Sequence, residues 1–239
     1  MRSVPLAAPV PGFPGAAWAV TEIVDRSPDF LSRSERTLFD TLQAPKRRRE
    51  WLAGRAAARS ALRALGGGAA SVLRTDEGAP RLEGPGAERL EVAITHGRNH
   101  AAAVAAPLTG PFPHLGIDWV DAEDRVRLLR IAKRVLSPQE RAQSEADPVA
   151  LQVAWGAREA VAKATRTGMF AFALHGVRVT ALDAAGGTAE LDLEGSLSRF
   201  WVRPEGSVIV VAAVSGVTRA RAQRLADEAR SRGSHPTSE

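Results

Sequence analysis

The sequence contains no cysteine and no tyrosine, and aromatic side chains make up only 5% of its 239 residues. The absence of cysteine excludes disulfides, thiolate catalysis and thiolate metal sites. So few aromatic side chains give little support to a stacking platform for single-stranded nucleic acid. No uninterrupted apolar run is long enough to span a bilayer, so a membrane protein is not expected.

What the sequence does contain is typical of a globular protein with excess basic charge. Hydrophobic residues account for 44%, charged residues for 25%, and the net charge is +5. Excess basic charge favours anionic partners, such as nucleic acid, phosphorylated small molecules or an acidic protein. The first 15 residues hold four prolines and lack the apolar core of a signal peptide. Residues 1–15 are therefore predicted to be a flexible leader, and the protein is expected to be cytoplasmic.

The order of the predicted elements indicates the fold class. Each half of the chain reads as a strand, then helices, then several short strands, and the segment PLTGPFP at 107–113 is the predicted linker. This order is not a regular alternation of strands and helices, so it predicts an α+β fold. The expected units are an N-terminal subdomain over 16–109, a C-terminal subdomain over 110–217 and a helical, then polar tail over 218–239. The halves match in length and element order, although no sequence repeat is apparent.

Several helix ends are predicted from capping residues. Ser27 or Asp29 is expected to cap a helix that runs to about residue 42. Ser137, followed by proline, is expected to begin a short helix. A longer helix over about 148–167 is expected to stop at Gly168.

The stretch HLGIDWVDAEDRV, which begins at residue 114, places acids at the end of an apolar strand. Asp118 lies inside the apolar run, where a carboxylate costs free energy unless it is paired or binds a metal. Asp121, Glu123 and Asp124 follow where the strand gives way to a helix, and capping of that helix explains them.

The stretch AWGAREAVAKATRTGM, residues 154–169, is typical of a helix that carries chemistry on one face. Trp155, Glu159 and Lys163 are spaced four residues apart and therefore share that face. Two interpretations remain open. The charged pair is an exposed i,i+4 ion pair, or Glu159 and Asp118 bind a hard cation such as Mg²⁺ while Lys163 neutralises a phosphate.

Basic residues crowd the start of the helix that begins near residue 45. They are Lys46, Arg47, Arg48, Arg49 and Arg55. A solvated basic face explains such a run, and so does phosphate capture, because arginine forks match phosphate oxygens. His96 ends a strand at a glycine turn, where a structural and a functional role are both open.

Taken in order, six stretches of the sequence resemble the 4′-phosphopantetheinyl transferases, specifically the larger surfactin-type class. They are RRREWLAGR, RTDEGAP, ITHG, GID, LSPQE and WGAREAVAKATRTGM, and the match spans roughly residues 45 to 170. Each stretch alone is weakly specific, whereas the ordered set is specific. The resemblance implies two similar α+β subdomains related by a pseudo-twofold axis, with coenzyme A bound between them, in a monomer.

The resemblance also implies roles for individual residues. Asp118 and Glu159 are implied as metal ligands, and Glu159 and Lys163 as catalytic residues. The implied coenzyme A contacts are Lys46, Arg48, Arg74, Gly78, Thr95, His96, Arg158 and Lys163. The implied cofactor is Mg²⁺, and the implied partner is an acidic apo carrier protein of fatty acid, polyketide or nonribosomal peptide synthesis. Neither a membrane nor a nucleic acid is expected to be a partner.

Three positions depart from the family pattern. Val120 stands where many members have a third acid, Ala79 replaces a turn lysine, and Arg158 replaces a lysine. Either two protein ligands with extra water suffice for the metal, or Asp121 helps through water. Arg81 or one of the helix arginines is the candidate replacement for the missing lysine. The valine and the alanine favour an alternative, which is a non-catalytic protein that binds coenzyme A or nucleic acid on the same fold.

Overall fold

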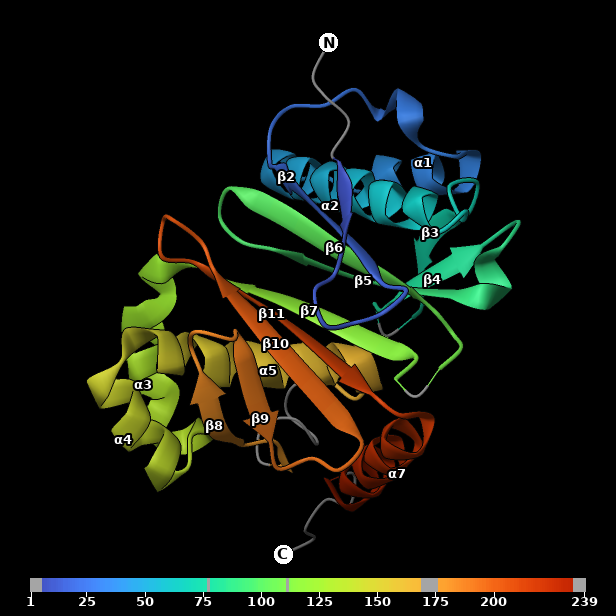
Figure 1. The fold of residues 1–239 in the computed structure, drawn as a ribbon. Coiled ribbons are helices and arrows are strands. Elements are labelled where there is room, and N and C mark those ends of the chain that lie inside the picture. Colours follow the sequence, from blue (N-terminus) through green and yellow to red (C-terminus); the bar gives the residue numbers. More distant parts are fainter. Residues whose placement is uncertain (1–5, 77, 111, 169–175, 234–239) are drawn as a thin grey trace, which may run out of the picture.

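The structure is a computed structural model that describes residues 6–76, 78–110, 112–168 and 176–233 (Figure 1). Parts of several predicted features lie outside these residues: the start of the leader (1–5), Glu77 in a turn, Pro111 in the linker, Met169 in the helix motif, His175 before a strand and the end of the tail (234–239). Within the described ranges, no helix is both long and apolar enough to cross a membrane.

Among the residues that the structure describes, the first half of the chain contains two α-helices and six strands. They are β1 (Ala7–Pro9), β2 (Ala17–Glu22), α1 (Arg33–Asp40), α2 (Pro45–Ala64), β3 (Ser71–Arg74), β4 (Pro80–Glu83), β5 (Leu90–His96) and β6 (His100–Pro107). Proline at the first turn begins α2, alanine, leucine and arginine favour its helical conformation, and a glycine triplet follows its end.

Among the described residues, the elements of the second half again run from strand through helices to four strands, but with three α-helices instead of two, and a C-terminal helix follows. They are β7 (His114–Val120), α3 (Arg125–Val135), α4 (Pro138–Ala146), α5 (Pro148–Thr165), β8 (Val179–Asp183), β9 (Thr188–Leu191), β10 (Ser196–Val202), β11 (Val208–Val214) and α7 (Gly216–Gly233). Ser137 caps α4 and Pro138 occupies its first turn, as the sequence predicts.

In each half, the strand that precedes the helices pairs with the last strand of that half. β2 pairs antiparallel with β6, and β7 pairs antiparallel with β11. The two main sheets have the orders β1-β2-β6-β5 and β7-β11-β10-β9-β8, while β3 and β4 form a separate ribbon. The α+β fold of two similar halves is thus confirmed.

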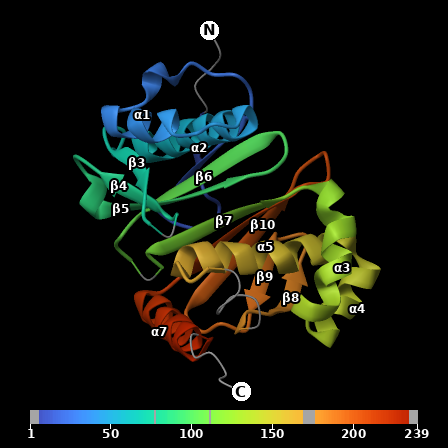
Figure 2. The ribbon, with the colours of Figure 1, turned by 180° about the vertical axis from the view of Figure 1, so that it is seen from behind.

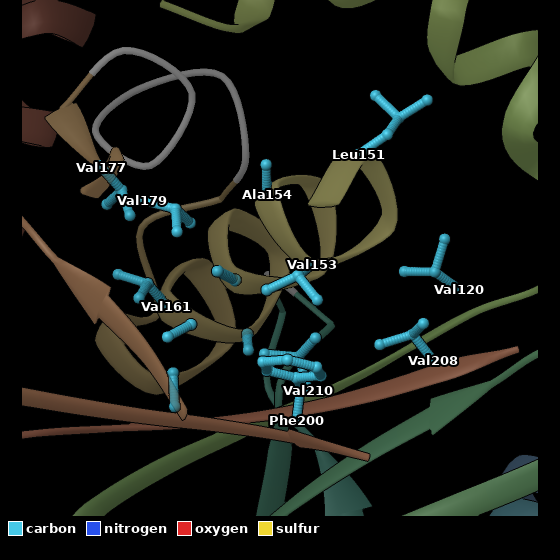
Figure 3. Packing of buried hydrophobic residues seen from close by; sticks show 14 of the residues in the cluster. Val120, Leu151, Val153, Ala154, Val161, Val177, Val179, Phe200, Val208 and Val210 are labelled. Carbon is cyan, nitrogen blue, oxygen red and sulfur yellow. The ribbon is translucent and has the colours of Figure 1, made fainter. Parts of the chain in front are cut away.

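Alternating side chains on the central strands build a four-layer molecule. On β11, Ile209 faces the other sheet, whereas Val210 packs against α5. On β6, Val104 faces the other sheet, whereas Ala103 packs against α2. The layers therefore run α2, first sheet, second sheet, α5, as two opposite views show (Figures 1 and 2). Val153 and Val161 of α5 lie against the second sheet (Figure 3).

Two capping boxes reveal a repeat that the sequence analysis did not find. Residues 31–36 read LSRSER and residues 136–141 read LSPQER, so both contain L-S-x-x-E-R. In each stretch the serine caps a helix and its side chain accepts the N–H of the glutamate, while the glutamate accepts the N–H of the serine. The repeat is hard to recognise from the sequence because the residues around the two motifs are not similar.

The glutamates of the two boxes, Glu35 and Glu140, are buried and play the same structural role in each half. Each accepts a backbone N–H from the following strand and a guanidinium from the long helix. The matched contacts are Glu35 with Val72 (3.1 Å) and Arg59 (2.6 Å), and Glu140 with Val179 (2.9 Å) and Arg158 (2.8 Å). The pseudo-twofold relation therefore extends to individual side chains.

The expectation of a flexible leader is wrong for the part of it that the structure describes. Residues 7–9 form β1, which pairs antiparallel with β2. Val10 and Phe13 are buried in the apolar layer between the two sheets. The apolar side chains among the prolines anchor this segment, and burial of a side chain such as Phe13 contributes about 2 kcal/mol.

Two predicted helix ends are also wrong. Ser27 caps only a short 3₁₀ turn, while α1 is capped by Ser32, because Ser32 has a glutamate three residues later and completes a reciprocal box. The long helix α5 ends at Thr165, since Arg166 adopts a left-handed conformation with φ 57° before Gly168 is reached.

Candidate active site

A cleft of about 850 Å³ lies between the two halves, beside the neighbouring strands β5 and β7. It is lined by the start of α2, the ends of β5 and β7, and one face of α5. An adjoining hollow of about 870 Å³ extends toward the β3–β4 turn and α7. Glu159 and Lys163 line both spaces, so these two side chains lie where the cleft and the hollow meet.

An ion pair between Lys163 of α5 and Asp118 of β7 lies within this cleft. Lys163 Nζ is 2.6 Å from Asp118 Oδ1 and 2.9 Å from the carbonyl oxygen of Ile117. Thr95 on β5 joins the network, because its hydroxyl is 3.2 Å from Asp118 Oδ1 and accepts the N–H of Trp119. Since β5 belongs to the first half and β7 to the second, this network ties the halves together.

Gly116 explains how α5 comes close enough for this pair to form. A Cβ at Gly116 would lie 1.8 Å from the carbonyl oxygen of Ala160 on α5 and 2.8 Å from the backbone nitrogen of Ala164. Real Cβ atoms do not approach backbone atoms so closely, so only glycine fits between β7 and α5. The glycine of the G-I-D stretch thus sets the distance between the strand with Asp118 and the helix with Lys163.

Gly116→Ala is expected to destabilise the protein by about 3 kcal/mol and to lower any activity of the site. The added methyl group would push α5 away from β7 and separate Lys163 from Asp118. Chemical denaturation measures the first effect. Gly216→Ala is the matched control, because a Cβ at Gly216 meets nothing within 4 Å and this variant should change stability by less than about 0.5 kcal/mol. Equal stability of the two variants would contradict the role of Gly116.

Glu159 lies one helical turn before Lys163 and, like Asp118, presents a carboxylate to the cleft. No ion pair joins Glu159 to Lys163 within the described ranges, so the interpretation as a surface i,i+4 pair does not hold. Burial raises the pKa of Glu159, and the charge of Asp118 raises it further, while Lys163 and Arg127 act in the opposite direction. A carboxylate with a raised pKa is a stronger base than an ordinary glutamate side chain, which suits it to accept a proton from a substrate.

One basic side chain at the start of α2, Lys46, lines a wall of the cleft, and its neighbour Arg47 lies against His96 in the same wall. Lys46 lies there with Glu50, and Arg47 Nη1 is 3.3 Å from His96 Nε2 at the end of β5. Burial lowers the pKa of His96, and the charges of Arg47 and Lys163 lower it further against the opposing effect of Glu50. A lowered pKa favours the neutral form of His96 at pH 7, in which Nε2 can accept a hydrogen bond from Arg47.

The structure does not bring every predicted contact into the cleft. Arg158 is only 1% exposed, and its guanidinium is paired with Glu140, so the prediction that it contacts coenzyme A is corrected. Arg48 lies with its guanidinium 3.9 Å from the ring centre of Phe39 and donates to the carbonyl of Leu42. Arg48 therefore faces α1 rather than the cleft.

Other predicted residues lie elsewhere along the cleft and hollow. Thr95 and His96 line the cleft, and Gly78 lines the hollow beside Ala79. Arg74 ends β3 just before this turn and lines neither space among the residues described.

The two candidate replacements for missing family residues have other partners. Asp121 accepts the indole N–H of Trp119 at 2.9 Å and the backbone N–H of Arg98 at 2.6 Å. Both of its oxygens are therefore occupied in holding the β5–β6 turn. Arg81 pairs with Glu83 on the exposed ribbon at 3.7 Å.

Asp118 and Glu159 are the cleft residues that could hold a divalent cation. In the described part of the chain, no group of three or more histidine, cysteine, aspartate or glutamate side chains gathers as a metal site. The charge of Asp118 nevertheless raises the pKa of Glu159, so the two carboxylates are close enough to repel each other. Two carboxylates fit Mg²⁺, which in proteins often binds one or two carboxylates and takes its other ligands from substrate phosphates and water.

A charge cluster around the buried Glu91 lies beside the hollow and was not predicted from the sequence. The Glu91 carboxylate on β5 accepts hydrogen bonds from Arg166 at 2.8 Å and from Arg219 of α7 at 2.9 Å. It also lies 2.6 Å from Nδ1 of His114. These residues come from both halves and from the C-terminal helix. No local pattern could reveal the cluster, because its members lie up to 128 positions apart.

Two family models match the chain. The one described as the 4′-phosphopantetheinyl transferase N-terminal domain matches residues 35–106. The one described as the 4′-phosphopantetheinyl transferase superfamily matches residues 114–213. Together the matches include α2, β5, β7 and α5, which form the walls of the cleft. No curated protein matches the chain.

Proposed function

Because the chain belongs to the 4′-phosphopantetheinyl transferase superfamily, we propose that it transfers the arm of coenzyme A to a serine of an apo carrier protein, with Mg²⁺ required. Transfer of phosphopantetheine in general follows from the family. The metal, the acceptor and the roles of individual residues are our proposal. The observation that carries these roles is the pair of carboxylates, Asp118 and Glu159, beside Lys163 in the cleft between the halves.

In the proposed reaction the serine oxygen forms a bond to the β-phosphorus of coenzyme A. The bond from that phosphorus to 3′,5′-adenosine bisphosphate breaks, and the serine proton moves to the carboxylate of Glu159. The raised pKa of Glu159 supports this role, because a base works best when its pKa lies near the working pH. The nucleophile belongs to the carrier protein, so the site needs no serine or cysteine of its own.

Asp118 and Glu159 would hold the cation from β7 and α5. A bound Mg²⁺ would polarise the phosphate and neutralise charge on the pyrophosphate. Lys163 would supply a further positive charge to the same pyrophosphate. Lys46, Arg47 and His96 on the opposite wall would contact the remaining phosphate of coenzyme A.

The acceptor is proposed to be an acidic carrier protein. The net charge of +5 supports this choice, since complementary charge favours encounter. Both walls of the cleft come from one chain, which supports a monomer as the working unit. The two carboxylates beside Lys163 favour catalysis over the non-catalytic alternative, because simple binding of the anionic coenzyme A has no use for two carboxylates in the cleft.

Coenzyme A affinity tests the basic wall of the cleft. Arg47→Ala is expected to raise the Kd for coenzyme A about tenfold, because it removes one charge-assisted contact to phosphate. Arg48→Ala is the matched control, since Arg48 packs on Phe39 and should leave the Kd unchanged while lowering stability by about 1 kcal/mol. Isothermal titration calorimetry measures both Kd values. An unchanged Kd in Arg47→Ala would support the alternative interpretation, in which these basic residues form a solvated surface.

A further inference from the structure

The ammonium of Lys163 is fully occupied by the protein itself. It lies 2.6 Å from Asp118 Oδ1, 2.9 Å from the carbonyl oxygen of Ile117 and 3.3 Å from Thr95 Oγ1. An ammonium has three N–H donors, and these three acceptors match that number. In this arrangement Lys163 has no donor left for a phosphate, although its side chain is 30% exposed and lines the cleft.

Asp118 depends on this lysine. Its side chain is only 11% exposed and lies on a strand whose neighbours are apolar. A buried carboxylate without a counter-charge costs several kcal/mol. Among the described residues, the Asp118 carboxylate is hydrogen-bonded to the Lys163 ammonium and to the Thr95 hydroxyl. Val120, two residues later on the same strand, has no charge or polar group to add.

We propose that Lys163 is an internal counter-ion that a divalent cation must displace from Asp118, so that cation binding itself releases the lysine to the phosphates of the substrate. This inference rests on the proposed function. Without coenzyme A, Lys163 and the cation compete for Asp118. With coenzyme A present, each helps the other, because the released ammonium gains the pyrophosphate as a new partner.

The first test measures Mn²⁺ binding by electron paramagnetic resonance on the full chain, without coenzyme A or carrier protein. Lys163→Met is expected to bind Mn²⁺ at least tenfold more tightly than the wild type, because the competitor is gone. Arg127→Met is the matched control, because Arg127 lowers the pKa of Glu159 but makes no contact with Asp118 within the described ranges. This variant should tighten Mn²⁺ binding clearly less than Lys163→Met. Unchanged or weaker binding by Lys163→Met, equal tightening by Arg127→Met, or no binding by any variant would overturn the proposal.

A second measurement needs no variant of Lys163 and covers the case in which Lys163→Met folds poorly. The chain has three lysines, Lys46, Lys133 and Lys163. Nitrogen-15 spectra of the lysine ammonium groups should show that Mg²⁺ shifts the signal of Lys163, while those of Lys46 and Lys133, assigned by their methionine variants, stay in place. A Lys163 signal that does not move at saturating Mg²⁺ contradicts the displacement.

The displacement of Lys163 and the proposed transferase function can be disproved independently. If Mg²⁺-dependent transfer occurs but Mn²⁺ affinity is the same with and without Lys163, the displacement is wrong and the proposed function stands. If the lysine is displaced but no carrier protein is modified, the displacement stands and the proposed function is wrong.

Discussion

Glu159→Gln is expected to lower the rate of phosphopantetheine transfer on the order of 10²- to 10⁴-fold. Glutamine keeps the size and shape of the side chain but can neither accept the serine proton nor hold a cation as a carboxylate does. Single-turnover transfer to an apo carrier protein measures the loss. Glu145→Gln on the exposed surface of α4 makes the same chemical change outside the cleft and should retain the wild-type rate.

The same variant should not lose stability. Burial and Asp118 raise the pKa of Glu159, so ionised Glu159 costs folding free energy above that pKa and the cost disappears as the pH falls through it. Glutamine carries no charge, so Glu159→Gln should be at least as stable as the wild type at pH 7. A near-normal transfer rate in Glu159→Gln would show that another group is the base.

Glu140→Ala is expected to destabilise the protein by about 3–5 kcal/mol. The change leaves the guanidinium of Arg158 without its carboxylate at a position only 1% exposed. It also removes the acceptor of the backbone N–H groups of Ser137 and Val179. Urea denaturation followed by circular dichroism measures the loss. Asp40→Ala, which breaks an exposed pair with Arg36 at 3.8 Å, should change stability by less than about 1 kcal/mol.

The contribution of Glu140 should also depend on pH in a defined direction. Burial alone raises the pKa of this carboxyl, but the hydrogen bonds and charge of Arg158, with two backbone N–H groups, outweigh burial and leave the pKa below its ordinary value. The stabilisation is therefore present above the pKa of the unfolded chain and is lost as the pH falls through the lower folded pKa. If Glu140→Ala and the wild type had equal stability at pH 7, the buried pair would contribute nothing.

Patterns short enough to read locally were predicted well. The strands around Asp118 and His96, the long helix with Glu159 and Lys163, and the α+β class all follow from periodicity, glycine turns and proline positions. These features depend on side chains within a few residues of each other, so the sequence contains the whole signal. The same holds for Ser137, whose box lies entirely within residues 137–140.

Directions of long basic side chains could not be predicted. Lys46, Arg47 and Arg48 are consecutive, yet consecutive residues on a helix point about 100° apart, so Arg47 reaches His96 while Arg48 lies on Phe39 of α1. Arg158 precedes Glu159 and for the same reason points away from the cleft, into the core beside Glu140. Which arginine meets the cleft depends on packing between α1, α2 and α5, and no local pattern records it.

Intact mass spectrometry of an apo carrier protein after incubation with this protein, coenzyme A and Mg²⁺ is the direct test of the proposed transfer. The carrier is expected to gain the mass of one phosphopantetheine arm. The gain should disappear on addition of EDTA and with Glu159→Gln. If acyl and peptidyl carrier proteins all remained unmodified while the protein still bound coenzyme A, the chain would bind coenzyme A without transferring its arm.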